Sequence, residues 1–251
     1  MKLSAAIITY NEERNLDRCL QSLVGIVDEI VVVDSFSTDQ TEAIAKLHGA
    51  KFITHAFAGH IQQKNYALDH TSGDWILSLD ADEALDETLR TSILEVKKKQ
   101  EAPGYSMNRL TNYCGHWVRY CGWYPDAKVR FVQRGAARWT GVNPHDRLEL
   151  NDHLRTHHLA GDILHYSYYT REDHLRQIEY FGTIASRELH AQGKQISLAM
   201  ACLKVVAQFV KSYFLKTGFL DGTTGFTISR LSAYATWRKY SMLRKLNQHH
   251  E

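Results

Sequence analysis

The sequence is poor in proline and in cysteine. Only 3 of its 251 residues are proline and only 4 are cysteine. So little proline, together with 44% hydrophobic residues, excludes a disordered or low-complexity chain. The cysteines lie at positions 19, 114, 121 and 202 and form no CxxC pair. This spacing excludes a zinc knuckle and a redox dithiol, and it indicates ordinary reduced thiols.

The chain also lacks a segment that would obviously direct it into a membrane. Its start, MKLSAAIITYNEE, holds one lysine and a short apolar run that ends at Asn11, without a small-residue cleavage site. We interpret this run as a buried strand. Lys204, Gln208 and Lys211 interrupt the most apolar stretch, so no unbroken run of about 18 apolar residues remains. The sequence therefore predicts a cytoplasmic protein that spans no membrane.

Charge is distributed unevenly along the chain. Residues 194–251 hold nine basic and two acidic residues, whereas residues 1–193 hold 21 basic and 26 acidic residues. The net charge of +2 is therefore the average of a −5 body and a +7 C-terminal segment. A basic segment of this kind points to an anionic surface, although solvated surface helices give the same count. Nothing in the composition indicates nucleic-acid binding.

The first hundred residues alternate between short apolar runs and helical patterns. The runs cover residues 3–9, 29–34, 50–54 and 74–79, and helix-like segments lie between them at 12–23, 39–48 and 60–70. Strands that are buried on both faces consist of nearly continuous apolar residues. The alternation therefore predicts an α/β, Rossmann-like fold with a mostly parallel sheet.

The second part of the chain has a different character. After a charged helical segment at 85–100, residues 104–169 are rich in aromatic, β-like segments, and helical patterns follow at 171–192, 197–216 and 225–246. We expect one domain over residues 1–193, with halves at 1–100 and 101–193. A helical, basic segment over residues 194–251 follows it.

Polar side chains occur where three of the predicted strands end. The first run leads into Thr9, Tyr10, Asn11 and Glu12, the second into Asp34, and the fourth into Asp80, Ala81, Asp82 and Glu83. Ligands of open parallel sheets bind beyond the carboxyl ends of the strands. The sequence thus predicts a binding site at this edge.

The carboxylates of Asp80 and Asp82 are the sharpest feature of this edge. They lie two positions apart, directly after an apolar run. In such a pair, one carboxylate can reach a ribose hydroxyl while the other holds Mg²⁺ or Mn²⁺ against a diphosphate, because these ions prefer oxygen ligands. The alternative is that Asp82 or Glu83 caps the next helix.

Three segments carry a resemblance to a known family. ITYNEE, VVVDSFSTDQT and LSLDADE, in this order, look like the nucleotide-sugar half of an inverting family 2 glycosyltransferase with a GT-A fold. QQKNYAL, RWTGVNPHD and FLDGTTGF make the rest similar to lipopolysaccharide inner-core β-1,4-glucosyltransferases of Gram-negative bacteria, the WaaE/KdtX type. The resemblance implies that residues 1–100 bind a UDP-sugar, most simply UDP-glucose, and that residues 101–193 bind the acceptor.

The resemblance also implies roles for single residues. Thr9, Tyr10, Asn11 and Glu12 would form the loop beneath nucleobase and ribose, Asp34 would contact uracil, and Lys64 would face uracil or the diphosphate. Taken alone, Thr9 could be a strand-end hydroxyl and Lys64 a solvated helix residue. The family's DDGS turn is here Asp34, Ser35, Phe36 and Ser37. Phe36 in place of glycine predicts a differently shaped turn.

An inverting transfer needs a general base on the acceptor side. Relatives carry an acidic residue in a His-Glu-like pair, and His145-Asp146 occupies the matching position. The resemblance therefore implies that Asp146 is the catalytic base. The alternatives are Glu149, Asp126 and Asp162, or a merely turn-forming role for Asp146 after Pro144.

A divalent metal ion, Mg²⁺ or Mn²⁺, is the cofactor that the resemblance implies. It would stabilise the leaving diphosphate electrostatically, so that no acid need protonate the leaving group. Asp82 is the expected ligand, and His165 could complete the metal shell. The alternative for His165 is a packed or hydrogen-bonded histidine.

The segment from Ser197 to Lys216 combines an apolar surface with a narrow polar stripe. Such a helix can lie in a membrane interface with its lysines at lipid phosphates, or it can pack on the catalytic domain. We expect an amphipathic helix that holds the enzyme peripherally at the anionic cytoplasmic face of the inner membrane. There the acceptor would be a lipid-linked saccharide, the lipopolysaccharide core.

Several rival functions are consistent with parts of this pattern. A transferase could instead act on a polyprenyl phosphate or an exopolysaccharide. A sugar-nucleotide pyrophosphorylase would need a glycine-rich, basic loop after its first strand, which ITYNEE does not provide. A non-catalytic membrane adaptor would not need Asp34, Asp80 and Asp82 together.

Overall fold

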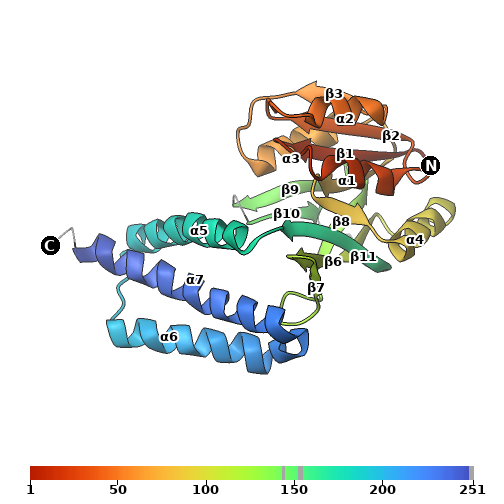
Figure 1. Cartoon of the computed structure of the whole chain (residues 1–251). Coiled ribbons are helices and arrows are strands. Elements are labelled where there is room, and N and C mark those ends of the chain that lie inside the picture. Colours follow the sequence, from red (N-terminus) through yellow and green to blue (C-terminus); the bar gives the residue numbers. More distant parts are fainter. Residues whose placement is uncertain (143–144, 152–154, 249–251) are drawn as a thin grey trace. The chain divides into compact units, whose positions relative to one another are not determined.

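The computed structural model describes residues 1–142, 145–151 and 155–248. The chain divides into two compact units (Figure 1). Unit 1 comprises Met1–Leu110 and Asp126–Tyr166, and unit 2 comprises Thr111–Pro125 and the chain from Ser167 onward. The division falls earlier than the expected domain boundary at residues 193 and 194, because the helix that starts at Arg171 packs along the last helix of the chain.

Unit 1 is built on a twisted mixed sheet. Its parallel part has the order β3-β2-β1-β4, with β1 Leu3–Thr9, β2 Glu29–Asp34, β3 Lys51–Thr54 and β4 Trp75–Asp80. The remaining strands of this sheet are β5 Glu83–Leu85, β6 Gly104–Tyr113, β7 His116–Val118, β8 Ala127–Gln133 and β11 Thr156–Tyr168, of which β7 lies within the unit 2 segment Thr111–Pro125. A separate antiparallel hairpin consists of β9 Ala137–Val142 and β10 His145–Leu150. The predicted α/β class and the parallel first half are confirmed.

The helices of unit 1 are α1 Leu16–Leu23, α2 Thr41–Leu47, α3 His60–Asp69 and α4 Glu87–Lys98. The apolar face of α1 is made by Leu16, Cys19, Leu20 and Leu23, each with 0% exposure. This i, i+3, i+4, i+7 spacing places all four side chains on one helical stripe against the sheet. Burial of such a stripe, rather than helix propensity, is what stabilises an eight-residue helix.

The start of α4 excludes the alternative that Asp82 or Glu83 caps this helix. Asp86 is the N-cap of α4, and its Oδ1 accepts a hydrogen bond of 2.7 Å from the amide of Leu89. Neither Asp82 nor Glu83 performs this capping. Gly161 has a φ of +98°, and a Cβ atom there would lie 2.2 Å from the Leu89 nitrogen. Only glycine therefore allows β11 to pass so close to this cap.

Unit 2 is helical. It contains α5 Arg171–Ala191, α6 Leu198–Val210, a π-helical turn at Lys211–Leu215, a 3₁₀ turn at Gly218–Asp221 and α7 Gly222–Gln248. A capping box between Thr170 and Asp173 starts α5. Figure 1 shows α5 and α6 each running beside α7. The predicted C-terminal helices are confirmed.

The helix of Leu198–Leu215 differs from expectation in one respect. Over these 18 residues it is long and apolar enough to cross a membrane by length and composition, and only 11% of it is buried. No such segment was expected from the sequence. Lys204 and Lys211 interrupt the run, but two charges in 18 residues do not remove its average apolar character.

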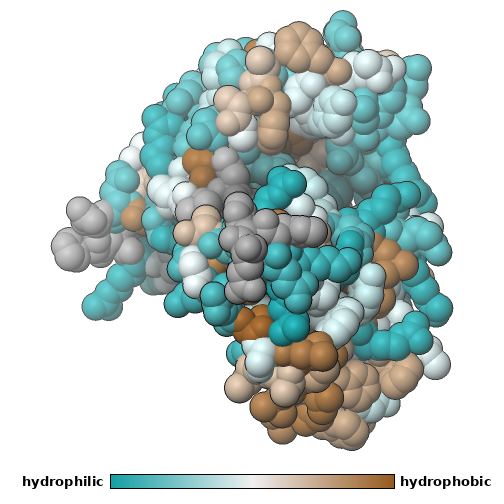
Figure 2. Space-filling model, turned by 90° about the vertical axis from the view of Figure 1, so that its left-hand side faces the viewer, coloured by the Kyte–Doolittle hydropathy of each residue, from teal (hydrophilic) through white to brown (hydrophobic). Residues whose placement is uncertain are grey.

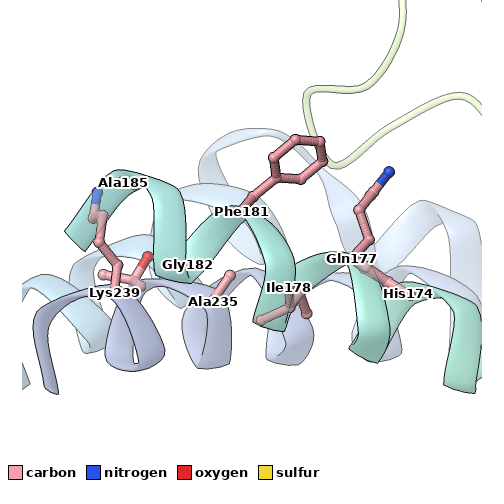
Figure 3. A pocket seen from close by; sticks show the side chains of 9 residues that line it. His174, Gln177, Ile178, Phe181, Gly182, Ala185, Ala235 and Lys239 are labelled. Atoms are coloured by element: carbon pink, nitrogen blue, oxygen red, sulfur yellow. The ribbon is translucent and has the colours of Figure 1, made fainter. Parts of the chain in front are cut away.

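His174 lies in the small core of unit 2. It is 6% exposed, its Nδ1 lies 3.3 Å from the hydroxyl of Tyr113, and its ring lies 4.7 Å from that of Tyr168. It also lines a cavity of about 310 Å³ between α5 and α7, where Ile178 and Ala235 pack together (Figure 3). Burial lowers the pKa of His174 from its ordinary 6.5 to about 4.

This depressed pKa predicts a loss of stability in mild acid. Above pH 6.5 the ring is neutral in both states, but at lower pH the unfolded chain takes up the proton first, so stability falls as the pH falls toward 4. At pH 5 the penalty is roughly 2 kcal/mol. His174→Gln should show a smaller drop in melting temperature between pH 7 and pH 5 than the native chain. Equal drops in the two proteins would contradict this assignment.

Candidate active site

The carboxyl ends of β1 and β2 are joined by buried side-chain hydrogen bonds. Asp34 is 2% exposed and accepts hydrogen bonds from the hydroxyl of Thr9 at 2.8 Å, the amide of Ser37 at 2.7 Å and the hydroxyl of Ser37 at 2.5 Å. The predicted nucleotide residues Thr9 and Asp34 are therefore neighbours. Their bonds fix the shape of the loop that follows β2.

The loop after β1 is fixed to the same turn. The amide of Asn11 donates to the Ser37 hydroxyl at 2.7 Å, and the Asn11 side chain accepts from the Thr38 amide at 2.9 Å. The amide of Glu12 donates to the Thr41 hydroxyl at 2.8 Å. Asn11 has a φ of +54°, in the left-handed region that asparagine tolerates better than most residues. The two loops thus form one rigid edge.

Phe36 occupies the position where the family pattern has glycine. It has a φ of +62°, so the backbone adopts the left-handed conformation that glycine favours. A non-glycine residue in this conformation carries a local strain of about 1 kcal/mol. The rings of Phe36 and Tyr10 are each 62% exposed. Two open aromatic faces therefore flank this edge of the sheet.

Asp80 is held by two buried cations. Lys64 Nζ lies 2.9 Å from one carboxylate oxygen and 3.2 Å from the other, and Arg130 Nη2 lies 3.3 Å away. Burial alone would raise the pKa of Asp80, but the charges of Lys64 and Arg130 overcome this and lower it well below the ordinary value. Lys64 is 6% exposed, which excludes the alternative of a solvated helix residue.

Asp82 faces a histidine from β11. Its carboxylate lies 3.2 Å from His165 Nε2, and Ala81 between the two aspartates is 4% exposed. Burial would lower the pKa of His165, but the negative charge of Asp82 outweighs burial and raises it. The structure thus brings together the two residues that the sequence analysis named as metal ligands.

The donor atoms present at Asp82 and His165 suit a partly substrate-held metal. Within residues 1–142, 145–151 and 155–248, no group of three or more His, Cys, Asp or Glu side chains is arranged to hold a metal ion. Mg²⁺ is often bound by one or two carboxylates, with substrate phosphates and water completing the shell. The carboxylate of Asp82 fits this pattern and the imidazole of His165 adds a nitrogen donor beside it, whereas Asp80 already faces two cations.

The site concentrates negative charge. Burial raises the pKa of Glu12 to about 7, a hydrogen bond from Asn15 opposes this, and the charges of Asp82, Asp39 and Asp80 raise it further. At neutral pH a carboxyl with this pKa is about half protonated. This edge of unit 1 therefore favours the arrival of a cation.

Asp146 reaches the same site from the β9–β10 hairpin. Lys64 Nζ lies 2.8 Å from its Oδ2, and the Asp146 side chain is 11% exposed. Asn65, the next residue of α3, exchanges two hydrogen bonds with the backbone of Trp139 on β9, at 2.9 and 3.0 Å. Lys64 also lies 4.2 Å from the centre of the Trp139 ring. The hairpin is thus fastened to α3, and Lys64 joins Asp146 to Asp80.

The other acidic residues considered as the catalytic base lie in different surroundings. Glu149 accepts a hydrogen bond of 2.5 Å from Thr140 and pairs with Arg147, and Asp126 pairs with Arg109 at 2.9 Å. Asp162 is 8% exposed and lies on β11. Among the four acids, Asp146 is therefore the one that shares Lys64 with Asp80.

A comparison with known proteins decides the family. The profile described as Glycosyl transferase family 2 matches residues 4–175, which is more than half of the chain. The chain belongs to glycosyl transferase family 2. The family match extends through β11 and into α5, so it includes every residue of the site described above.

Other proteins are similar to almost the whole length of this family 2 chain. An uncharacterized glycosyltransferase from Rickettsia felis is 30% identical over 97% of this chain and 90% of its own length. The lipopolysaccharide core biosynthesis glycosyltransferase LpsC from Rhizobium meliloti is 26% identical over 98% of this chain and 96% of its own length. Among solved structures, TarS 1-349 from S. aureus is 13% identical, covers 100% of this chain and 92% of that chain, and has a TM-score of 0.48.

Arg130, and its pairing with Glu83, were not predicted from the sequence. Arg130 on β8 is 4% exposed and bonds both Asp80 and Glu83, at 3.3 and 3.1 Å. Glu83 is 1% exposed, and its carboxylate also accepts from the Asp80 amide at 3.0 Å. The available signal was an arginine in the middle of an otherwise half-apolar strand, because a charge on a buried strand needs a partner.

The burial of Lys64 predicts a large effect of its removal. Lys64→Met leaves the carboxylates of Asp80 and Asp146 without a shared cation, and loss of one partner of a buried pair costs about 3 kcal/mol or more. The free energy of unfolding, measured in urea, should fall by that amount. Lys46→Met is the matched control, because Lys46 and Glu42 are 65% and 56% exposed. The control should change by less than about 1 kcal/mol, and equal effects would refute the pairing.

Proposed function

We propose that this family 2 glycosyltransferase is a metal-dependent inverting enzyme that transfers a hexose, glucose from UDP-glucose, onto the inner core of lipopolysaccharide. The observation that carries the proposal is the position of Lys64 Nζ, 2.9 Å from Asp80 and 2.8 Å from Asp146. Through Lys64, the carboxylate of Asp80 at the end of β4, which is suited to a nucleotide, is joined to the carboxylate of Asp146 on β10. A transferase needs both kinds of group beside one reaction centre.

The donor would bind along the joined loops after β1 and β2. The backbone of Thr9, Tyr10, Asn11 and Glu12 would line the uridine, and Asp34 would accept a hydrogen bond from uracil. The open rings of Tyr10 and Phe36, each 62% exposed, supply faces on which a base can stack. Asp80 would accept from a ribose hydroxyl.

Asp82 and His165 would hold Mg²⁺ or Mn²⁺. When bound, the ion neutralises the charge that develops on the leaving diphosphate. Lys64 and Arg130, which lie against Asp80, would also offset the negative charge of the leaving diphosphate. Lys64 is a flexible ammonium with three donors and can turn from a carboxylate to a phosphate oxygen.

Asp146 would act as the general base. It would take the proton of the acceptor hydroxyl while that oxygen bonds to the anomeric carbon and the bond from this carbon to the diphosphate breaks. Once Lys64 turns to the diphosphate, its contact with Asp146 would open and leave this carboxylate free to face the acceptor hydroxyl, so that donor binding precedes activation of the acceptor.

The acceptor class follows from two observations. LpsC, similar over 98% of this chain, is named as a lipopolysaccharide core biosynthesis enzyme. The exposed apolar helix of Leu198–Leu215 offers a surface for lipid. We infer a lipid-linked saccharide acceptor and peripheral attachment at the anionic cytoplasmic face of the inner membrane.

Metal-dependent donor binding is the first test. In isothermal titration, UDP should bind in the presence of Mn²⁺ and bind more weakly after EDTA treatment. Asp82→Asn should lower the affinity in Mn²⁺ by about tenfold or more. Asp69→Asn is the control, because Asp69 is 53% exposed and pairs with Arg138 at the surface. Equal UDP affinity with and without Mn²⁺ would contradict the proposed metal dependence.

The base is tested separately from the donor site. Asp146→Asn should retain UDP binding and lose transfer by about 10² to 10⁴-fold. Glu149→Gln, on the same strand β10 and with its side chain 46% exposed, should transfer like the native enzyme. Transfer by Asp146→Asn near the native rate would assign the base elsewhere.

A further inference from the structure

An apolar surface runs along one side of α6. The side chains of Leu203 and Val206 are each 61% exposed, and that of Phe214 is 55% exposed. Together with Leu198, Met200 and Val210 they form what we call the α6 surface. Figure 2 shows apolar residues gathered at the lower end of the view, the level at which Figure 1 draws α6. A contiguous patch of this kind marks an interaction site.

The charges around the α6 surface identify its partner. Residues 194–220 contain four lysines and no acidic residue, and Lys204, Lys211 and Lys216 are exposed. Two copies of the chain meeting through this surface would bring lysines together, which is unfavourable. An anionic phospholipid bilayer offers both apolar chains for the leucines and phosphates for the lysines.

Contacts at both ends hold α6 along α7. At its beginning, the side chains of Arg244 and Asn247 on α7 donate to the carbonyls of Ile196 and Lys194, each at 3.0 Å. At its end, the hydroxyl of Ser229 on α7 donates to that of Ser212 at 3.0 Å. Ser212 is 2% exposed, so this bond is buried.

The turn between α6 and α7 is also fixed. A Cβ atom on Gly225 would lie 1.8 Å from the carbonyl oxygen of Gly218, so only glycine lets the two segments touch. Asp221 is 7% exposed and accepts from the amide of Tyr120 at 2.9 Å. An α6 that crossed a bilayer would have to break the contacts at both of its ends or draw the cationic α7 into the membrane.

We propose that α6 is an in-plane membrane anchor, embedded in one leaflet through the α6 surface with its lysines at anionic lipid phosphates. It lies parallel to the bilayer and does not span it, although its length and composition would allow spanning. This inference deepens the proposed function, because it specifies how the enzyme meets a lipid-linked acceptor. Its test uses binding to vesicles and not transfer.

The first experiment is flotation of the full chain with vesicles. The native protein should float with phosphatidylethanolamine and phosphatidylglycerol vesicles, and less so with phosphatidylcholine or at high salt. Leu203→Glu with Val206→Glu should weaken binding about tenfold or more. Leu47→Glu is the matched control, since Leu47 is 81% exposed on α2, and it should float like the native chain. No flotation of the native chain, or full flotation of the double variant, would overturn the proposal.

The second experiment measures depth and does not depend on the glutamate variants. Nitroxide labels are placed at Leu198→Cys or Val206→Cys in a chain that carries Cys114→Ser and Cys202→Ser, because these two native thiols are exposed. An in-plane helix places both labels at the same depth. A spanning helix separates them by about 12 Å along the membrane normal, with position 206 near the midplane. That separation would overturn the proposal.

The two proposals can fail separately. UDP titration of the same vesicle samples reports the donor site of unit 1. If UDP binds in Mn²⁺ but the native chain does not float, the anchor is refuted and the transferase site stands. If the chain floats in-plane but no UDP binds, the anchor stands and the proposed donor chemistry is refuted.

Discussion

The ammonium group of Lys64 is the interaction on which the arrangement of this site depends. It lies between Asp80, at the end of the fourth parallel strand, and Asp146, on a hairpin that belongs to a different sheet. Taking a lysine out of water is costly unless carboxylates surround it. Here the carboxylates of Asp80 and Asp146 and the face of the Trp139 ring surround the ammonium group. Arg130 contacts the carboxylates of both Asp80 and Glu83 and so balances the rest of their negative charge.

This ion cluster explains why the hairpin lies where it does. Over the described residues the hairpin's strand pairing does not attach it to the main sheet, and hydrogen bonds to α3 hold it through Lys64, Asn65 and Asp69. The same lysine is the group expected to face the donor diphosphate. In the proposed mechanism, a change on the donor side would therefore reach Asp146 through this lysine.

Much of the fold was predictable because local signals and burial agree. The apolar runs at residues 3–9 and 29–34 become β1 and β2 with the same bounds, since strands buried on both faces carry an unbroken apolar pattern. The strand-end residues Thr9, Asp34 and Asp80 could be placed at one edge for the same reason. Parallel strands run in the same direction, so their carboxyl ends lie at the same edge of the sheet.

Other features needed three-dimensional information. The pairing of Arg130 with Asp80 joins positions far apart in sequence, and no local pattern encodes it. Phe36 takes a left-handed backbone conformation because the hydrogen bonds of Asp34 and Ser37 close the turn around it, which overrides the local preference. The compact-unit boundary moved to Tyr166 because α5 packs on α7, a long-range contact.

The most direct test of the account is a double-mutant cycle between Lys64 and Asp146. The free energy of unfolding is measured for the native chain, for Lys64→Met, for Asp146→Asn and for the double variant. Because the two charged groups are 2.8 Å apart and their side chains are only 8% and 11% exposed, we expect a coupling free energy of about 2 kcal/mol. Additivity of the two single effects to within about 0.5 kcal/mol would contradict it.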